Sequence, residues 1–148
     1  KALGIDKKLN GLALGKETLV SCTPKGIIRL IESTGTSIEG KNACIVNHSV
    51  VVGKPLALLL LNENCTVTIC HSKTIDIGAL TQQADIVCVA VGKPKTLRAD
   101  MVKQGAIIID AGTNREGEKL IGDVDFESVK EKASLITPVP CYRLRGGK

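Results

Sequence analysis

The stretch IVNHSVVVGKP at residues 45–55 decides the fold of this chain, together with the apolar run Leu56–Leu61 that follows it. A β-rich segment ends there in a polar turn, and Gly53, Lys54 and Pro55 then open a helix. In an α/β protein, such a strand–turn–helix unit aims free backbone N–H groups and the positive end of the helix at a phosphate. The stretch therefore predicts a cofactor-binding domain, and the alternative is that these three residues only start a helix.

Strand and helix patterns alternate along the rest of the chain. The expected strands cover residues 42–46, 66–70, 86–91, 106–110 and 135–137. A first helix is expected to have Thr23 as its N-cap and Pro24 at its first helical position, and to end at Gly35. Later helices are expected over residues 55–62, 77–82, 97–103 and 124–132.

The expected strands are apolar without alternating polar residues, which indicates a parallel sheet covered by helices on both faces. The predicted fold is therefore α/β: a doubly wound, mostly parallel, Rossmann-like sheet. This domain is expected to span residues 23–140, after a leading segment over 1–22 and before a divergent or artificial tail over 141–148.

The composition is typical of a soluble globular protein: 148 residues, 43% of them hydrophobic and 24% charged, with a net charge of +5. One Phe, one Tyr and no Trp provide few surfaces on which nucleic-acid bases stack. The apolar runs are much shorter than the ~20 residues of a membrane span. We therefore expect neither a nucleic-acid nor a membrane partner.

The six cysteines indicate reduced thiols rather than disulfides. Cys44, Cys70 and Cys88 fall in expected strands, where a thiol packs as a small apolar group. No Cys-x-x-Cys occurs, and the neighbours Cys70 and His71 point to opposite faces of a strand. The pattern favours a cytoplasmic protein without a metal site.

Ligands of doubly wound sheets lie at the carboxyl ends of the strands, near the point where the strand order reverses. Four polar or glycine-containing turns follow expected strands there: Asn47–Gly53, His71–Thr74, Val91–Pro94 and Asp110–Arg115. We expect the ligand site to be built from these turns.

Ser72 occupies the place after the second strand where dinucleotide sites usually carry an acid for the ribose 2′-OH of NAD. A hydroxyl at Ser72 with the cation of Lys73 beside it tolerates a 2′-phosphate, which a carboxylate would repel. This pattern favours NADP, with NAD as the other possibility. The alternative is that Ser72 and Thr74 cap the following helix.

Several further residues have both a functional and a structural interpretation. Gly92 permits a ligand to approach the backbone, or simply makes a turn. Asp110 is a catalytic acid or a turn acid, and Asp123 an acid/base group. Asp125 is an acid/base group or, more simply, the N-cap of the last helix. His48 contacts phosphate, titrates near neutrality, or has no role. No nucleophile–base pair is apparent, so no catalytic residue is assigned.

Five segments in combination resemble the bifunctional methylenetetrahydrofolate dehydrogenase/methenyltetrahydrofolate cyclohydrolase family. They are CTPKG at 22–26, VVGKPLA at 51–57, TVTICHSKT at 66–74, AVGKP at 90–94 and GDV at 122–124. The likeness runs from about residue 10 to residue 140. It implies an oxidoreductase that passes hydride from 5,10-methylenetetrahydrofolate to NADP and then hydrolyses the methenyl product to 10-formyltetrahydrofolate, usually as a homodimer.

The resemblance carries family cofactor contacts onto Asn47, His48 and Ser49, onto Ser72, and onto Thr113. With the residues selected from the turns, the expected cofactor-binding set is Asn47, His48, Ser49, Gly53, Lys54, Ser72, Gly92 and Thr113. The family's first turn reads Gly-Arg-Ser, and it has Ile where this chain has Thr113. An Arg is a permanent, bidentate phosphate partner, whereas an imidazole is largely neutral at pH 7, so His48 leaves the choice between NADP and NAD open.

The family's folate site, with its catalytic Tyr and Lys, lies in an amino-terminal domain that precedes these motifs. We expect that domain to be absent from this chain, and the chain alone to bind cofactor without turnover. After Thr137–Pro140 the family continues with Gly-Gly-Val-Gly-Pro, where this chain reads CYRLRGGK. The alternative function is a non-catalytic Rossmann-like binding or scaffold module. An unrelated dehydrogenase domain would need all five motif matches to be accidental.

Overall fold

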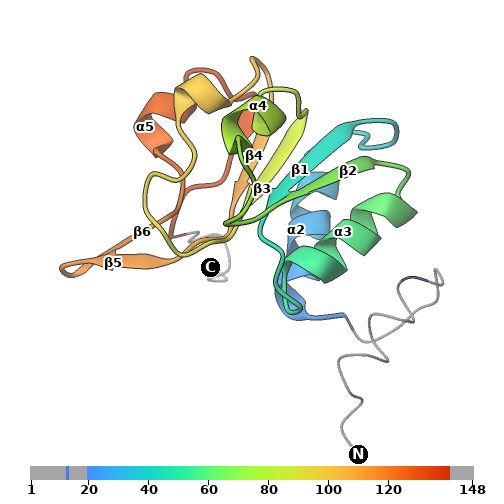
Figure 1. Cartoon of the computed structure of the whole chain (residues 1–148), viewed down its shortest axis with the longest axis horizontal. Coiled ribbons are helices and arrows are strands. Elements are labelled where there is room, and N and C mark those ends of the chain that lie inside the picture. The colour runs from blue at the N-terminus through green and yellow to red at the C-terminus, as the bar shows by residue number, and fades with distance from the viewer. Residues whose placement is uncertain (1–12, 14–19, 141–148) are drawn as a thin grey trace, which may run out of the picture.

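The computed structural model describes Ala13 and residues 20–140, and its centre is a five-stranded parallel sheet (Figure 1). The strands are β1 (Asn42–Val46), β2 (Thr66–Cys70), β3 (Ile86–Val89), β4 (Ile107–Asp110) and β7 (Leu135–Ile136). They lie in the order β2-β1-β3-β4-β7. All five expected strands are confirmed, three of them slightly shorter than expected.

Helices cover both faces of the sheet, as the apolar strands predict. They are α2 (Cys22–Glu32), α3 (Gly53–Asn62), α4 (Ile77–Thr81), the 3₁₀ turn η1 (Ala99–Met101) and α5 (Phe126–Val129). Figure 1 shows α2 and α3 on one side of the sheet and α4 and α5 on the other. Side chains from each strand divide between two cores: Ile45 packs toward α2 and α3, and Val46 packs on the opposite face. The doubly wound α/β fold is confirmed.

The strand order places a topological switch point between β1 and β3. The chain leaves β1 for β2 on one side, and then returns to form β3 on the other side of β1. The two connections therefore diverge from the carboxyl end of β1, and ligands of doubly wound sheets bind at such a point. This geometry makes the turns after β1, β2 and β3 the natural ligand-binding edge.

The start of the first helix differs from the expectation. Helix α2 begins at Cys22, with Ser21 as its N-cap residue, so Thr23 and Pro24 lie within the first turn. The Ser21 hydroxyl does not cap the helix and donates instead to the Val51 carbonyl at 2.6 Å. Pro24 is tolerated there because the first helical N–H groups have no intrahelical acceptor. The helix ends at Glu32, before the predicted stop.

Two expected helices are much shorter than predicted, since tertiary pairing holds their first residues extended. Leu97 forms a parallel bridge with Val124, and the backbone N–H of Asp125 donates to the Leu97 carbonyl at 2.9 Å. These residues cannot also be helical. The helix expected over 97–103 is therefore reduced to η1, and that over 124–132 is reduced to α5.

A hairpin follows β4 where the sequence analysis expected only a turn. Strands β5 (Asn114–Glu116) and β6 (Lys119–Ile121) pair antiparallel across a two-residue loop that starts with Gly117, at a φ of +62°. Such loops require a positive φ, so Gly117 was the available signal. Figure 1 shows this hairpin projecting from the body of the domain.

The cysteine prediction holds within the described part of the chain. Cys22, Cys44, Cys65, Cys70 and Cys88 are free thiols, and all but Cys22 are buried. Burial raises the pKa of the Cys44 and Cys88 thiols, which keeps them protonated. Most of the expected leading segment and the whole expected tail lie outside the described residues. None of the helices described here is sufficiently long and apolar to cross a membrane.

Candidate functional site

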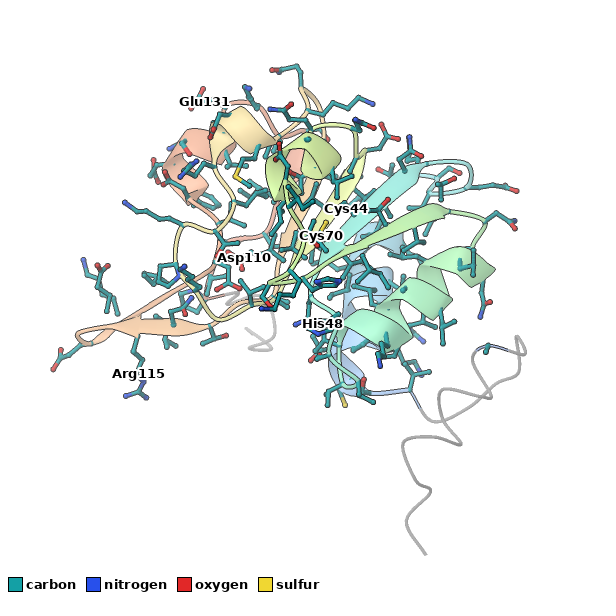
Figure 2. All side chains as sticks on the ribbon, in the orientation of Figure 1. Cys44, His48, Cys70, Asp110, Arg115 and Glu131 are labelled. Carbon is teal, nitrogen blue, oxygen red and sulfur yellow. The ribbon has the colours of Figure 1, made fainter. Side chains whose placement is uncertain are left out.

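The four turns predicted to form the site do lie at one edge of the sheet. The register pairs Val46 with Cys70 and with Val89, and Val89 with Asp110, so the strands β1 to β4 end at the same level. Figure 2 shows Cys70, His48 and Asp110 gathered toward this end of the sheet. The structure therefore brings the turns together, and their side chains decide what the edge can bind.

Asn47 anchors the turn after β1. Its Nδ2 donates to the carbonyl of Ala90 at the end of β3, while its Oδ1 accepts the N–H groups of Ser49 at 2.8 Å and Gly53 at 3.0 Å. A single uncharged side chain thus joins two strand ends across the switch point and shapes the turn between β1 and α3.

The expected free N–H groups at the start of α3 are not free. The Gly53 N–H is bound to Asn47, the Lys54 N–H donates to the Ser49 carbonyl at 2.9 Å, and Pro55 has no N–H. The first turn of the helix is therefore satisfied within the protein. This prediction was wrong, because the polar turn supplies its own acceptors.

In the described chain, the unpaired donors of this turn are instead the backbone N–H groups of His48, Val50 and Val51, for which no acceptor is present. An anion at this edge would meet the turn rather than the helix terminus. Gly53 has a structural role: a Cβ there would lie 2.2 Å from the backbone oxygen of Asn47. Lys54 is exposed beside it.

The turn after β2 leaves Ser72 and Lys73 exposed to solvent. The hydroxyl of Thr74 accepts the His71 N–H at 2.9 Å, and His71 Nδ1 accepts the Lys73 N–H at 3.2 Å. These bonds fix the backbone of the turn and do not occupy the Ser72 hydroxyl or the Lys73 ammonium.

The alternative role of Ser72 and Thr74 as helix caps is not what the structure shows. The N-cap of α4 is Asp76, whose carboxylate accepts the Ala79 N–H at 2.9 Å. Asp76 is thus engaged at the start of the helix, and the β2 turn itself carries no carboxylate. The turn presents a hydroxyl and a cation, as the sequence predicts.

Asp123 binds the backbone of the turn after β3 from its buried side. The side chain is fully buried and accepts the N–H groups of Val91 at 2.6 Å, Gly92 at 2.9 Å and Lys93 at 2.9 Å. It also accepts Asn114 Nδ2 at 2.8 Å. Because these donors occupy its oxygens, Asp123 is a structural acid here. The same bonds turn the Gly92 N–H inward, away from any ligand.

Asp110 plays a similar part at the end of β4. Its carboxylate accepts the N–H groups of Gly112 at 2.9 Å, Asp123 at 3.1 Å and Val124 at 2.9 Å. Burial raises the pKa of Asp110 above its ordinary value of 3.8, and the three N–H donors oppose that rise. The turn-acid interpretation of Asp110 is supported by these bonds.

Two glycines make room for the buried carboxylates. A Cβ on Gly112 would lie 2.0 Å from the carboxyl carbon of Asp123, and one on Gly122 would lie 1.9 Å from an oxygen of Asp110. Asp125 precedes α5 as expected of an N-cap residue, but its side chain makes no capping bond. Sequence reasoning missed how these groups interlock, since Gly-Asp-Val alone carries no signal for it.

The last expected contact, Thr113, is exposed on the turn between β4 and β5. No cluster of three or more candidate metal ligands occurs among the described residues. An apolar cavity of about 770 Å³ is lined by residues of α2, of β4 and of the edge strand β7. The turns after β1, β2 and β3 do not contribute to that cavity, so it is not part of this site.

Comparison with known proteins gives a consistent result. Residues 21–142 match the family described as "Tetrahydrofolate dehydrogenase/cyclohydrolase, NAD(P)-binding domain". The chain is 54% identical over 129 residues to the "Bifunctional protein FolD" of Caldanaerobacter subterraneus subsp. tengcongensis, which covers 87% of this chain and 46% of that protein. The chain therefore spans about half the length of the curated relatives it matches.

Solved structures agree with this match. The bifunctional enzyme FolD of Campylobacter jejuni has a TM-score of 0.88 at 47% identity, over 90% of this chain and 48% of that one. The Trypanosoma brucei N5,N10-methylenetetrahydrofolate dehydrogenase-cyclohydrolase, complexed with NADP cofactor and inhibitor, has a TM-score of 0.85 at 34% identity. That alignment covers 91% of this chain and 49% of the other.

Proposed function

Because this chain belongs to the tetrahydrofolate dehydrogenase/cyclohydrolase family, we propose that it supplies the NADP-binding part of an enzyme of that activity. The enzyme would oxidise 5,10-methylenetetrahydrofolate to 5,10-methenyltetrahydrofolate and hydrolyse that product to 10-formyltetrahydrofolate. We further propose a cytoplasmic homodimer. The relatives support the enzyme over a non-catalytic module, since the names they carry are those of bifunctional enzymes.

One observation carries the choice of cofactor. At the end of β2, next to the switch point, the chain presents the exposed hydroxyl of Ser72 and the ammonium of Lys73, with no carboxylate in the turn. A site for NAD usually places an acid on the ribose 2′-OH here, and an acid would repel a 2′-phosphate. Ser72 and Lys73 are therefore suited to NADP.

The residues at the edge fit the rest of a dinucleotide. We assign the pyrophosphate to the β1 turn of Asn47–Gly53, where the free N–H groups of His48, Val50 and Val51 supply donors. Lys54 adds a positive charge beside this turn, and Asn47 and Gly53 hold its shape. Bound NADP would accept the hydride.

Ser49 and two residues of the neighbouring turns complete the proposed set. The Ser49 hydroxyl accepts the Val52 N–H at 3.1 Å and so supports the β1 turn from within. Gly92 has a φ of +69°, is exposed after β3, and leaves space for a ligand above the backbone. Thr113 is exposed after β4. We propose that Gly92 and Thr113 border the cofactor.

A calorimetric titration of the 148-residue chain with NADP, and separately with NAD, tests this function. We expect NADP to bind more tightly than NAD, and Ser72→Asp to weaken NADP about tenfold through charge repulsion. Ser37→Asp, at an exposed position before β1, is the matched control and should leave binding unchanged. Failure of a chain shown to be folded by circular dichroism to bind either dinucleotide would refute the proposal, as would equal effects of the two substitutions.

A further inference from the structure

Two buried thiols meet between β1 and β2, outside the set of residues assigned to the cofactor. The Sγ atoms of Cys44 and Cys70 are 3.5 Å apart, and one thiol donates a hydrogen bond to the other. Cys44 is 1% exposed and Cys70 is fully buried. Figure 2 shows the two side chains close together on the sheet. The chain therefore holds a pair of sulfurs to which the proposed function gives no role.

The register of the two strands disfavours a direct bond between the sulfurs. Cys44 pairs with Thr68, so Cys70 lies two residues further along the neighbouring strand. Strands about 4.8 Å apart, with a rise of about 3.3 Å per residue, place the two Cα atoms roughly 8 Å apart. A disulfide between Cα atoms more than about 7 Å apart requires the backbone to move. An atom that bridges the two sulfurs avoids that movement.

The distance between the sulfurs selects the kind of bridging atom. With bonds of about 2.3 Å, the length of a zinc–sulfur bond, an atom that joins sulfurs 3.5 Å apart has a bond angle of roughly 100°. That angle is much too small for a linear two-coordinate ion. A tetrahedral zinc ion accepts it but needs further ligands, and the described residues contain no cluster of three candidate ligands. Pyramidal trivalent arsenic has bond angles close to this value and bonds sulfur at a similar length.

The surroundings of the pair favour an uncharged product. The other buried side chains of this core, on the sheet face that α4 and α5 cover, are all hydrocarbons, among them Val46, Val87 and Val89. Two thiolates around a monovalent metal ion would leave a negative charge in that core, which is costly without a partner. A trivalent arsenical with two hydroxyl groups and one carbon substituent binds two sulfurs without leaving a charge.

We propose that Cys44 and Cys70 form a two-thiol binding site for trivalent arsenicals, for which methylarsonous acid, CH3As(OH)2, is the probe. In the binding step, both S–H bonds and both As–OH bonds break, and two As–S bonds form. Each hydroxyl group leaves with one thiol proton as water, and no atom is oxidised or reduced. The product is neutral, and its methyl group matches the hydrocarbon core. This site does not depend on the proposed cofactor function.

Strand β2 offers a route from solvent to the pair. It is an edge strand of the sheet, and Cys70 is its last residue, directly before the exposed His71 and Ser72. Local opening of this strand end, without unfolding of the whole domain, exposes the pair. Burial also raises the pKa of both thiols, which keeps them protonated at neutral pH. We therefore expect a monofunctional alkylating reagent to react first with the exposed Cys22 and slowly with the pair.

Mass spectrometry of the intact 148-residue chain, treated with methylarsonous acid in excess glutathione, tests the site. Glutathione is a monothiol, so it removes arsenic from single cysteines but competes poorly with two thiols that the fold holds together. We expect the wild type to retain one adduct, with the mass of the reagent less two waters. A small dithiol such as dithiothreitol should remove that adduct.

Three valine variants identify the sulfurs. Cys44→Val and Cys70→Val each leave one thiol of the pair, so the apparent affinity for the arsenical should fall about a hundredfold. Cys88→Val is the matched control, because Cys88 is a buried strand cysteine in the core on the opposite face of the sheet. This control should retain the adduct. Valine suits a buried strand position, and circular dichroism checks the fold of each variant.

Three results would overturn the inference. The first is a folded wild type that retains no adduct in glutathione. The second is an adduct of undiminished affinity in Cys44→Val or Cys70→Val, since other thiols would then hold the arsenic. The third is a folded Cys88→Val variant that loses the adduct as completely as the variants of the pair. If one variant of the pair fails to fold, the other variant and the wild type still decide between these results and the expected one.

Discussion

The turn after β1 and the turns after β3 and β4 lie at one edge of the sheet. An uncharged side chain holds the first turn, and charged side chains hold the other two. An uncharged amide, Asn47, anchors the first turn, and two carboxylates, Asp123 and Asp110, anchor the others. The amide both donates to a carbonyl and accepts two N–H groups. The carboxylates only accept, and between them they bind seven donors.

This difference shows where negative charge is tolerated beside the proposed phosphate site. Asp123 is buried and surrounded by N–H donors, which offset the cost of removing its charge from water. A carboxylate in the β1 turn would instead face the carbonyl of Ala90 and the region assigned to the pyrophosphate. Asn47 holds that turn without adding a negative charge to it.

Removing the charge of Asp123 is expected to have the largest effect on the free energy of unfolding. Asp123→Asn turns an NH₂ group toward N–H donors, so we expect the free energy of unfolding to fall by about 3–5 kcal/mol. Urea denaturation at pH 7 measures it. Asp125→Asn is the matched control, because the Asp125 side chain makes no capping bond, and it should cost less than about 0.5 kcal/mol. Equal losses in the two variants would contradict the anchoring role.

Replacing the uncharged Asn47 with a carboxylate is expected to have a smaller effect on stability. Asn47→Asp preserves the shape and the two accepted bonds but removes the donor to Ala90, at an expected cost of about 1–3 kcal/mol at pH 7. Part of the loss should be recovered on acidification, since a protonated carboxyl can donate again. Gln104→Glu adds the same charge at an exposed site and is the control in thermal denaturation. Stability insensitive to Asn47→Asp would show that the Ala90 contact contributes nothing.

The pH dependence of Asp110 is the smallest expected effect. Its pKa is raised by burial, so above pH 3.8 the folded state binds more protons than the unfolded chain. Stability from this group therefore increases as the pH falls through the interval between the raised value and 3.8. The advantage of the wild type over Asp110→Asn in urea should grow as the pH falls from about 7 toward 4.

Asp85 is the control for the Asp110 prediction, because its pKa is shifted in the opposite direction. The ion pair with Lys103 lowers the pKa of Asp85, so its contribution is present above pH 3.8 and is lost as the pH falls below that value. The difference between the wild type and Asp85→Asn should therefore stay constant from about pH 7 to 5 and shrink in more acid solution. A constant advantage over Asp110→Asn across the same range would overturn the assignment for Asp110.

Local patterns predicted the framework of the domain well. The strands over residues 42–46 and 66–70 have the expected bounds. The first is an almost continuous apolar run, and the second alternates polar and apolar residues, and both patterns are typical of strands. The turns of the site followed from those strand ends. The helices expected from residues 97 and 124 were too long, since the bridge between Leu97 and Val124 overrides helix preference.

The roles of single site residues were less predictable. Gly53 was expected to belong to the cofactor-binding set, and the structure shows that its missing side chain accommodates the backbone of Asn47. Asp123 was considered as an acid/base group, and its oxygens are occupied by backbone donors. Ser72 was expected either to face a ligand or to cap α4, and the cap proved to be Asp76. In each case the deciding partner is identified only in the folded chain.

Local sequence patterns were sufficient to predict that strands and helices alternate, that the sheet is parallel and covered on both faces, and that the polar turns follow the strands. These properties depend on local periodicity and on the burial of apolar side chains. Those patterns did not predict the strand order β2-β1-β3-β4-β7, the bond from Asn47 to Ala90, or the contact of His48 with His71, which are seen only in the folded chain. These contacts join residues far apart in the chain, so they exist only where the order of the strands brings two turns to the same edge.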